Sequence, residues 1–283
     1  MMEGHSLVEV KEITKTFYVG GQEIPVLRGI TFSIEQGDFC ILVGPSGCGK
    51  STLLHTILGL EQPTSGEIIF LGENIYHNTD EDYRSNFRKK HIGMIYQQPN
   101  WIKSMNVVEN VAFPLILLGM EKDQATQRAM ELLTEVNLAT WASFMPTELS
   151  GGQQQRIALA RGLANNPEII IADEPTGNLD FQAGQNVMQL LSDLNVKQGK
   201  TVIMVTHDLE YLRYARKAVR LLDGKVLQIY TEETIHQLVS EVKTKRGVGT
   251  AGPDQPVTDP LATPTIQPPM PITPPPVQSV PPS

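Results

Sequence analysis

The fold class of this 283-residue chain is decided by one stretch, Phe39-Cys-Ile-Leu-Val-Gly44-Pro-Ser-Gly-Cys-Gly-Lys50-Ser51. Its first five residues are apolar without a break, which is typical of a strand buried on both faces. The eight residues that follow match the pattern G-x-x-x-x-G-K-[ST], and apolar residues within 53–58 then give one face to a helix. A strand, a glycine-rich loop and a helix in this order predict a loop that holds a polyphosphate.

Each residue type in this loop has a chemical reason. Glycines let the backbone turn its N–H groups toward phosphate oxygens without side-chain clashes, and the helix N-terminus adds a favourable dipole. Lys50 is expected to reach the β- and γ-phosphates, and the Ser51 hydroxyl is expected to ligate Mg²⁺. Cys48 is either a small spacer or a redox-active thiol, and we favour the spacer. The predicted nucleotide-binding residues of the loop are Gly44, Pro45, Ser46, Gly47, Cys48, Gly49, Lys50, Ser51 and Thr52.

The second half of the site is predicted much further along the chain. The run Ile169-Ile-Ile-Ala-Asp173-Glu174 reads as a buried strand that ends in two adjacent carboxylates. Alone, such a pair would indicate a solvated turn, but a rigid strand can fix it beside the phosphate loop. Asp173 would then bind Mg²⁺, and Glu174 would act as general base toward the attacking water. His207 ends the strand pattern Thr201–Thr206, and we expect it to sense the γ-phosphate and orient water.

Strand and helix patterns alternate between residues 7 and 246. Besides 39–43, apolar runs at 93–96, 169–172 and 202–205 predict buried strands. The alternation with helices such as Lys122–Asn137 and Gln153–Ala164 indicates an α/β fold with a mainly parallel sheet. Leu7–Ile13 and Val26–Ile34 predict an antiparallel pair, and Asp223-Gly224 predicts a terminal hairpin. Residues 99–165 predict a helical insert, because they contain no buried-strand pattern.

The composition argues against several classes of protein. Twenty-three basic residues against 31 acidic ones give a net charge of −8, which argues against a nucleic-acid partner. Two cysteines, Cys40 and Cys48, cannot build a disulfide framework and fit a reducing compartment. Apolar stretches stay well below the ~20 residues that span a bilayer. Residues 247–283 hold 12 of the 20 prolines and no Lys or Arg. We therefore expect a disordered proline-rich tail there, after a short helix at 233–246.

A second anion site is predicted from Leu149-Ser-Gly-Gly-Gln-Gln-Gln-Arg156. Ser150 can cap the helix that begins there, and Gly151 and Gly152 leave backbone N–H groups of its first turn open. Two half-sites in different lobes of one chain suggest a head-to-tail dimer that encloses two nucleotides. The same eight residues resemble the signature motif of ATP-binding cassette (ABC) ATPases. The resemblance implies that Ser150, Gly151, Gly152 and Gln153 contact the nucleotide held by the opposite copy.

Other elements of the ABC family come in order along the chain. Gln97 resembles the Q-loop glutamine that contacts Mg²⁺ and the attacking water. Asn178-Leu-Asp180 resembles the D-loop, which places Asp180 among the nucleotide-site residues, and Thr206-His207-Asp208 resembles the switch-histidine segment. Phe17 matches the aromatic residue that stacks on adenine, with the neighbouring Tyr18 as the alternative.

The resemblance covers about residues 7–230 and implies both a fold and a function. It implies a P-loop NTPase (RecA-like) domain over residues 7–232, with an antiparallel β subdomain and a helical subdomain at about 99–165. It also implies a cycle in which MgATP closes a homodimer and hydrolysis reopens it. Ala172-Asp-Glu-Pro-Thr-Gly-Asn-Leu-Asp180 resembles the branch that serves lipoprotein release, macrolide export and cell division.

In that branch the ATPase works with integral-membrane permeases, so the implied location is the cytoplasmic face of the inner membrane, bound through a permease. Trp101 and Ile102 follow Gln97 where a Leu-Leu-Pro-like stretch is common in the family. They are either exposed anchors for a partner helix or residues packed inside the helical insert.

Two other functions stay open at this point. The first is a regulatory or mechanical module, in which nucleotide-driven closure activates an extracytoplasmic partner without transport. The second is a soluble cassette ATPase of DNA repair or translation. The second is weaker, because this chain has a single cassette and no basic surface signal.

Overall fold

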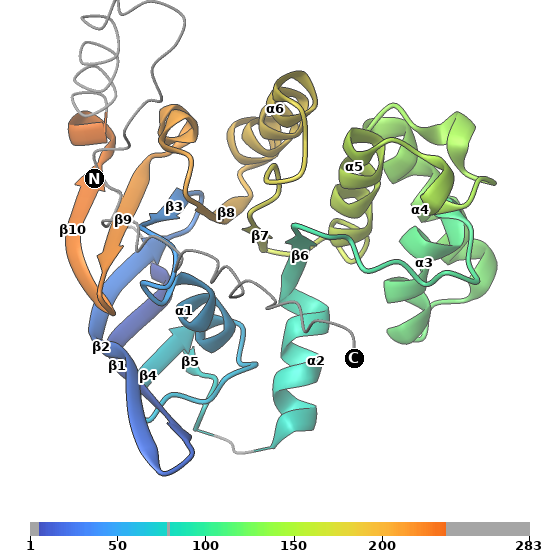
Figure 1. Cartoon of the computed structure of the whole chain (residues 1–283). Coiled ribbons are helices and arrows are strands. Elements are labelled where there is room, and N and C mark those ends of the chain that lie inside the picture. The colour runs from blue at the N-terminus through green and yellow to red at the C-terminus, as the bar shows by residue number, and fades with distance from the viewer. Residues whose placement is uncertain (1–5, 78–79, 236–283) are drawn as a thin grey trace, which may run out of the picture. The chain divides into compact units, whose positions relative to one another are not determined.

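The main sheet of the computed structural model, which describes residues 6–77 and 80–235, has the strand order β10-β9-β3-β8-β7-β6 (Figure 1). Its parallel centre consists of β3 (Phe39–Val43), β8 (Thr201–Thr206), β7 (Ile169–Asp173) and β6 (Ile92–Tyr96). The four buried strands predicted from the sequence are therefore confirmed. Three of them are one or two residues longer than predicted, because end residues such as Ile92 and Thr201 still pair with the neighbouring strand.

The terminal hairpin is also confirmed. Strand β10 (Lys225–Thr231) pairs antiparallel with β9 (Lys217–Leu222) around Asp223 and Gly224, which both have positive φ. Strand β9 in turn pairs in parallel with β3. The hairpin thus extends the main sheet beyond β3, which the local turn pattern did not predict.

The side chains of β3 divide the interior into two cores. Phe39 and Ile41 belong to the core beneath α6 (Phe181–Gln198) and the 3₁₀ segment η3 (Leu209–Tyr214). Cys40 and Leu42 belong to the core around α1 (Lys50–Ile57). Because successive side chains of a strand point to opposite faces, one five-residue strand contributes to both cores.

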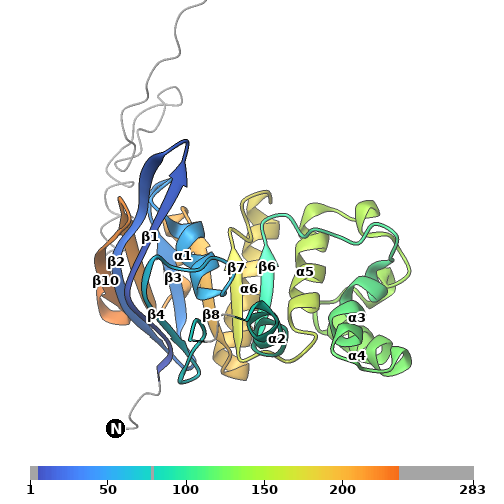
Figure 2. The ribbon, with the colours of Figure 1, turned by 90° about the horizontal axis from the view of Figure 1, so that it is seen from below.

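An antiparallel sheet packs against the other side of α1, so that this helix lies between two sheets (Figure 2). Its strand order is β2-β1-β4-β5, with β1 at Ser6–Val19, β2 at Gln22–Glu35, β4 at Ser65–Phe70 and β5 at Glu73–Asn74. The predicted antiparallel pair is confirmed and runs further in both directions, whereas β4 and β5 were missed.

The chain between β6 and β7 contains helices and turns and, within residues 99–165, no strand. The helices are α3 (Val107–Leu117), α4 (Lys122–Glu135) and α5 (Gly151–Gly162), with 3₁₀ turns at Ala139–Trp141 and Pro146–Glu148. Helix α4 ends two residues before the predicted Asn137, which has a φ of +58°. Helix α5 starts two residues before the predicted Gln153, because Ser150 caps it.

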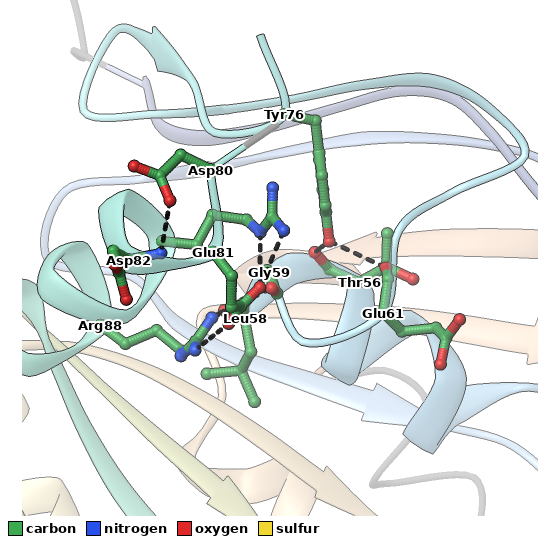
Figure 3. A network of polar contacts seen from close by, with 10 residues as sticks. Thr56, Leu58, Gly59, Glu61, Tyr76, Asp80, Glu81, Asp82 and Arg88 are labelled. Atoms are coloured by element: carbon green, nitrogen blue, oxygen red, sulfur yellow. Dashed lines mark hydrogen bonds and ion pairs between the residues drawn. The ribbon is translucent and has the colours of Figure 1, made fainter. Parts of the chain in front are cut away.

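Helix α2 (Glu81–His91) was not singled out by its sequence and is tied to the end of α1 by charge (Figure 3). Arg88 donates to the carbonyl oxygen of Gly59 at 3.0 Å and to the Glu81 carboxylate at 2.6 Å. Hydrogen bonds from Arg88 and then Arg84 lower the pKa of Glu81. A cation at the carboxyl end of α1 is favourable, because backbone carbonyl groups are unpaired there.

Only the first turn of the predicted C-terminal helix at 233–246 is described, with residues 232–235 helical. The remainder of that helix and the predicted tail at 247–283 lie outside the described residues, so the proposed domain limits stay predictions. None of the helices in the described ranges is long and apolar enough to cross a membrane.

Strand β6 approaches α5 closely at Gly93, and a substitution there tests whether this close approach is required. A Cβ at Gly93 would lie 2.3 Å from the carbonyl oxygen of Gly162 and 2.9 Å from Cγ of Pro167. We expect Gly93→Ala to lower the free energy of unfolding by about 1–3 kcal/mol, because strand and helix must move apart. Chemical denaturation measures the change. Gly162→Ala is the matched control, since its Cβ would lie 3.3 Å from the nearest atom and a helix favours Ala. Equal losses in the two variants would contradict this account.

Candidate functional site

The predicted phosphate loop connects β3 to α1 and packs tightly at both ends. A Cβ at Gly44 would lie 2.4 Å from the carbonyl oxygen of Leu221, and one at Gly49 would lie 2.9 Å from a methyl group of Leu27. Close approach therefore requires glycine at both positions. Gly49 has a φ of 101°, and α1 begins without a side-chain cap. A helix that leaves its first N–H groups without a side-chain partner, at the end of a glycine-rich loop, fits a bound phosphate.

Lys50 is buried at the start of α1 and is 7 % exposed. Its ammonium donates to the carbonyl oxygens of Gly44 at 2.7 Å and Pro45 at 2.9 Å. Among the described residues no carboxylate forms an ion pair with it. A buried cation held by neutral acceptors is costly, and phosphate oxygens would supply the missing negative charge. Ser51 and Thr52 come next in the first turn of the helix.

Asp173 is the last residue of β7 and is half-buried. Burial raises the pKa of its carboxyl and the charge of Glu174 raises it further, whereas His55 and Lys50 lower it. In the described part of the chain, no cluster of three His, Cys, Asp or Glu side chains is placed to hold a metal by itself. Mg²⁺ usually takes one or two carboxylates together with phosphate oxygens and waters. Asp173 therefore fits a metal that is bound along with a nucleotide.

Glu174 comes directly after β7 in a conformation that is uncommon for this residue, with a φ of 45°. Its N–H donates to the carbonyl oxygen of Val205 at 2.9 Å, which ties it to β8. Its two carboxylate oxygens lie 3.1 and 3.2 Å from Nδ1 of His207. Because an ionised carboxylate only accepts hydrogen bonds, we assign the shared proton to Nδ1. The predicted general base and the predicted phosphate sensor are thus in direct contact.

Glu174 and His207 line a cavity of about 230 Å³ that also contains two aromatic residues absent from the sequence prediction. Phe181 is 70 % exposed at the start of α6, and Tyr211 is buried with its hydroxyl 3.0 Å from the Cβ position of Gly184. Neither residue belongs to a recognisable motif, so the sequence contained no signal for them.

Gln97 reaches the same region from the end of β6. Its Nε2 lies 3.5 Å from Oδ1 of Asn178, at the outer limit of a hydrogen bond. A Cβ at Gly177 would lie 2.7 Å from Nε2 of Gln97 and 3.4 Å from the Glu174 carboxylate. The structure therefore brings Gln97 and Glu174 together around Gly177. Asp180 lines the same cavity as Glu174 and His207 and also caps its own helix, since its carboxylate accepts from the N–H of Ala183 at 2.8 Å.

The serine-glycine turn at the start of α5 is held by a capping box. The Ser150 hydroxyl accepts from the N–H of Gln153 at 3.4 Å, and the Gln153 side chain accepts from the N–H of Ser150 at 2.9 Å. The N–H groups of Ser150 and Gln153 are thus paired within the turn, and those of Gly151 and Gly152 take no part in this capping box. The turn packs against the predicted D-loop, with the Cβ position of Gly151 3.4 Å from Leu179.

Within one chain the serine-glycine turn and the phosphate loop lie in different places. Helix α5 packs beside β6, and β6 is separated from β3 by β7 and β8 (Figures 1 and 2). Three strand spacings amount to roughly 14 Å. Gln155, which was not among the predicted site residues, links α5 to β6 by donating to the carbonyl oxygen of Tyr96 at 2.9 Å.

Two alternatives that the sequence left open differ in burial. Phe17 is half-buried, whereas Tyr18 is 70 % exposed, and Phe17 as the residue that stacks on adenine stays a prediction. Trp101 packs against the helical core, donates to the side chain of Gln154 at 2.9 Å and lies 4.5 Å from the Arg161 guanidinium. Trp101 is therefore packed inside the helical insert, whereas Ile102 is half-buried.

Comparisons with known proteins agree with this geometry. The ABC transporter family model matches residues 27–177. A lipoprotein-releasing system ATP-binding protein, LolD of Geobacter metallireducens, is 41 % identical over 78 % of this chain and 98 % of its own length. The macrolide export ATP-binding/permease protein MacB of Syntrophobacter fumaroxidans is 42 % identical over 78 % of this chain and 31 % of its own length.

A solved structure gives the same result. The ATP-binding cassette MJ0796 of Methanocaldococcus jannaschii, in a dimeric post-hydrolysis state bound to ADP and Pi, has a TM-score of 0.74 and 41 % identity. The match covers 80 % of this chain and 98 % of that cassette. The chain described here belongs to the ABC transporter family and is one of its ATPases.

Proposed function

We propose that two copies of this chain bind two MgATP molecules head to tail, and that hydrolysis drives a membrane permease of the lipoprotein-release or export type. The observation that carries the proposal is the separation of the phosphate loop from the serine-glycine turn within one chain. Each chain contains both half-sites, and a symmetric partner brings one half-site of each copy against the other. The dimeric MJ0796 cassette supports this arrangement.

The chain's own side chains have separate tasks at such a site. Lys50 and the uncapped N-terminus of α1 bind the phosphates, and the Ser150–Gly152 turn of the opposite copy adds a second helix N-terminus. Ser51, Asp173 and Gln97 would hold Mg²⁺, which offsets negative charge on the phosphate oxygens when it is bound. Glu174 accepts a proton from the attacking water, and His207 holds the Glu174 carboxylate in place.

The role of Glu174 can be tested by removing its basicity. We expect Glu174→Gln to reduce ATP turnover at least about 100-fold, because an amide cannot take the proton. ATP binding should persist, and size-exclusion chromatography with MgATP should detect an accumulated dimer. Glu131→Gln changes an exposed carboxylate on α4 that pairs with Arg128, and it should leave turnover unchanged. Normal turnover in Glu174→Gln, or a monomer under saturating MgATP, would contradict the proposal.

The head-to-tail arrangement predicts complementation between two inactive variants. Lys50→Ala removes the phosphate-loop cation, and Gly151→Asp places a carboxylate where the opposite copy presents a triphosphate. Each variant alone should lose turnover. A mixed dimer contains one site with both defects and one intact site, so mixing the variants should restore measurable ATPase activity. The mixture could stay inactive although mass spectrometry detects mixed dimers. In that case the phosphate loop and the serine-glycine turn at one nucleotide would not come from opposite chains.

The membrane partner is identified by isolating the complex. We expect an affinity-tagged chain to be recovered with membranes, together with an integral-membrane chain, and to leave the membrane fraction when that partner is deleted. A partner with a path for lipid-anchored or hydrophobic substrates supports release or export. A partner with a long extracytoplasmic coiled coil and no path for a substrate would indicate mechanical activation instead of transport. A fully active dimer that never binds membranes would contradict both.

A further inference from the structure

Lys15 of β1 has three partners, and one of them is the ring of Phe17. Its ammonium donates to the carbonyl oxygen of Gln62 at 2.7 Å and forms an ion pair with the Glu61 carboxylate. The same nitrogen lies 4.9 Å from the centroid of the Phe17 ring, within the range of a cation–π interaction. The Lys15 side chain is only 14 % exposed, so these contacts are shielded from water.

Leu27 connects Lys15 to the phosphate loop. Lys15 pairs with Leu27 across the β1–β2 hairpin. A methyl group of Leu27 lies 2.9 Å from the Cβ position of Gly49, the residue that ends the loop. Residues two apart in a strand share a face, so Lys15 and Phe17 lie together at this edge of the antiparallel sheet. Tyr18 follows Phe17 on the other face of the strand and is largely exposed.

The loop that holds Lys15 is itself held in place (Figure 3). The Tyr76 hydroxyl lies 2.6 Å from the carbonyl oxygen of Thr56 and 2.8 Å from that of Glu61. Arg88 donates to the carbonyl oxygen of Gly59. Residues 56–61 are therefore fixed before any ligand binds, and Lys15 has a rigid support.

We propose that Lys15 is a positioning residue for the nucleotide base, which fixes the Phe17 ring as a stacking surface beside the phosphate loop. The inference rests on the proposed function, because it requires a nucleotide at that loop. The ammonium lies against the ring, so the ring loses little freedom when a base stacks on it. The ion pair with Glu61 offsets the charge of Lys15, which therefore contributes little to binding of the phosphates themselves.

The test compares two ligands on the full-length protein. MgADP and magnesium pyrophosphate both carry a diphosphate, but only MgADP also carries a ribose and a base. We expect Lys15→Met to raise the Kd for MgADP about three- to tenfold. The Kd for magnesium pyrophosphate should change less than twofold. Lys15→Arg, which keeps a cation over the ring, should bind both ligands like the wild type. Lys11→Met is the matched control, because Lys11 lies on the same strand and forms an exposed ion pair with Glu9.

A double-mutant cycle with Phe17 shows whether Lys15 acts on binding by positioning the Phe17 ring or by stabilising the fold in general. Phe17→Leu keeps apolar bulk but removes the aromatic surface, and adding Lys15→Met to it should cause no further loss of MgADP affinity. Tyr18→Ala should leave MgADP binding unchanged. If Lys15→Met fails to fold, Lys15→Gln keeps a donor for Gln62 without the charge and takes its place in every comparison.

Two patterns would overturn the inference about Lys15. One is an equal loss of MgADP and pyrophosphate affinity, and the other is an additive loss in the double variant. If wild-type protein bound neither ligand, the proposed nucleotide site itself would be wrong. Failure of the nucleotide site would be seen with the wild-type protein, whereas failure of the inference about Lys15 would be seen only when the variants are compared with it.

Discussion

Parallel strands end at one edge of a sheet, and the candidate site depends on this constraint. The phosphate loop leaves β3, Gln97 leaves β6, Glu174 leaves β7 and His207 leaves β8, and these strands are hydrogen-bonded neighbours in one sheet. Their interiors are apolar and buried, so the strands have little freedom to slide. Side chains that are far apart in sequence are thereby placed within a few ångströms of one another, as the contact between His207 and Glu174 demonstrates.

The sequence predicted this part of the fold well because the signals are local. Phe39–Val43 and its neighbouring parallel strands are short apolar runs, and the glycines, Lys50 and the paired carboxylates come directly after them. The capping role of Ser150 was predicted for the same reason, since serine with glutamine three residues later is a helix-start pattern. Features that depend on a few adjacent residues were therefore predictable from the sequence alone.

The remainder depends on contacts between distant residues, which no local pattern reveals. Strand β9 joins β3 across most of the chain, and Lys15 meets Glu61 through a loop whose position is set by Tyr76 and Arg88. Gln153, which is predicted to contact the nucleotide, also uses its backbone N–H and its Oε1 in the capping box. The packed position of Trp101 depends on Arg161 and Gln154, which lie on a helix far along the chain.

The two ends of helix α1 differ in their side-chain partners. Arg88 supplies positive charge at the carboxyl end of the helix, whereas the amino end has no side-chain cap. An anion at that end completes the helix, so its binding energy adds to the stability of the folded chain. A ligand at 100 times its Kd contributes about 2.7 kcal/mol. The thermal stability of this protein is then expected to rise with the concentration of any nucleotide that binds at the amino end of this helix.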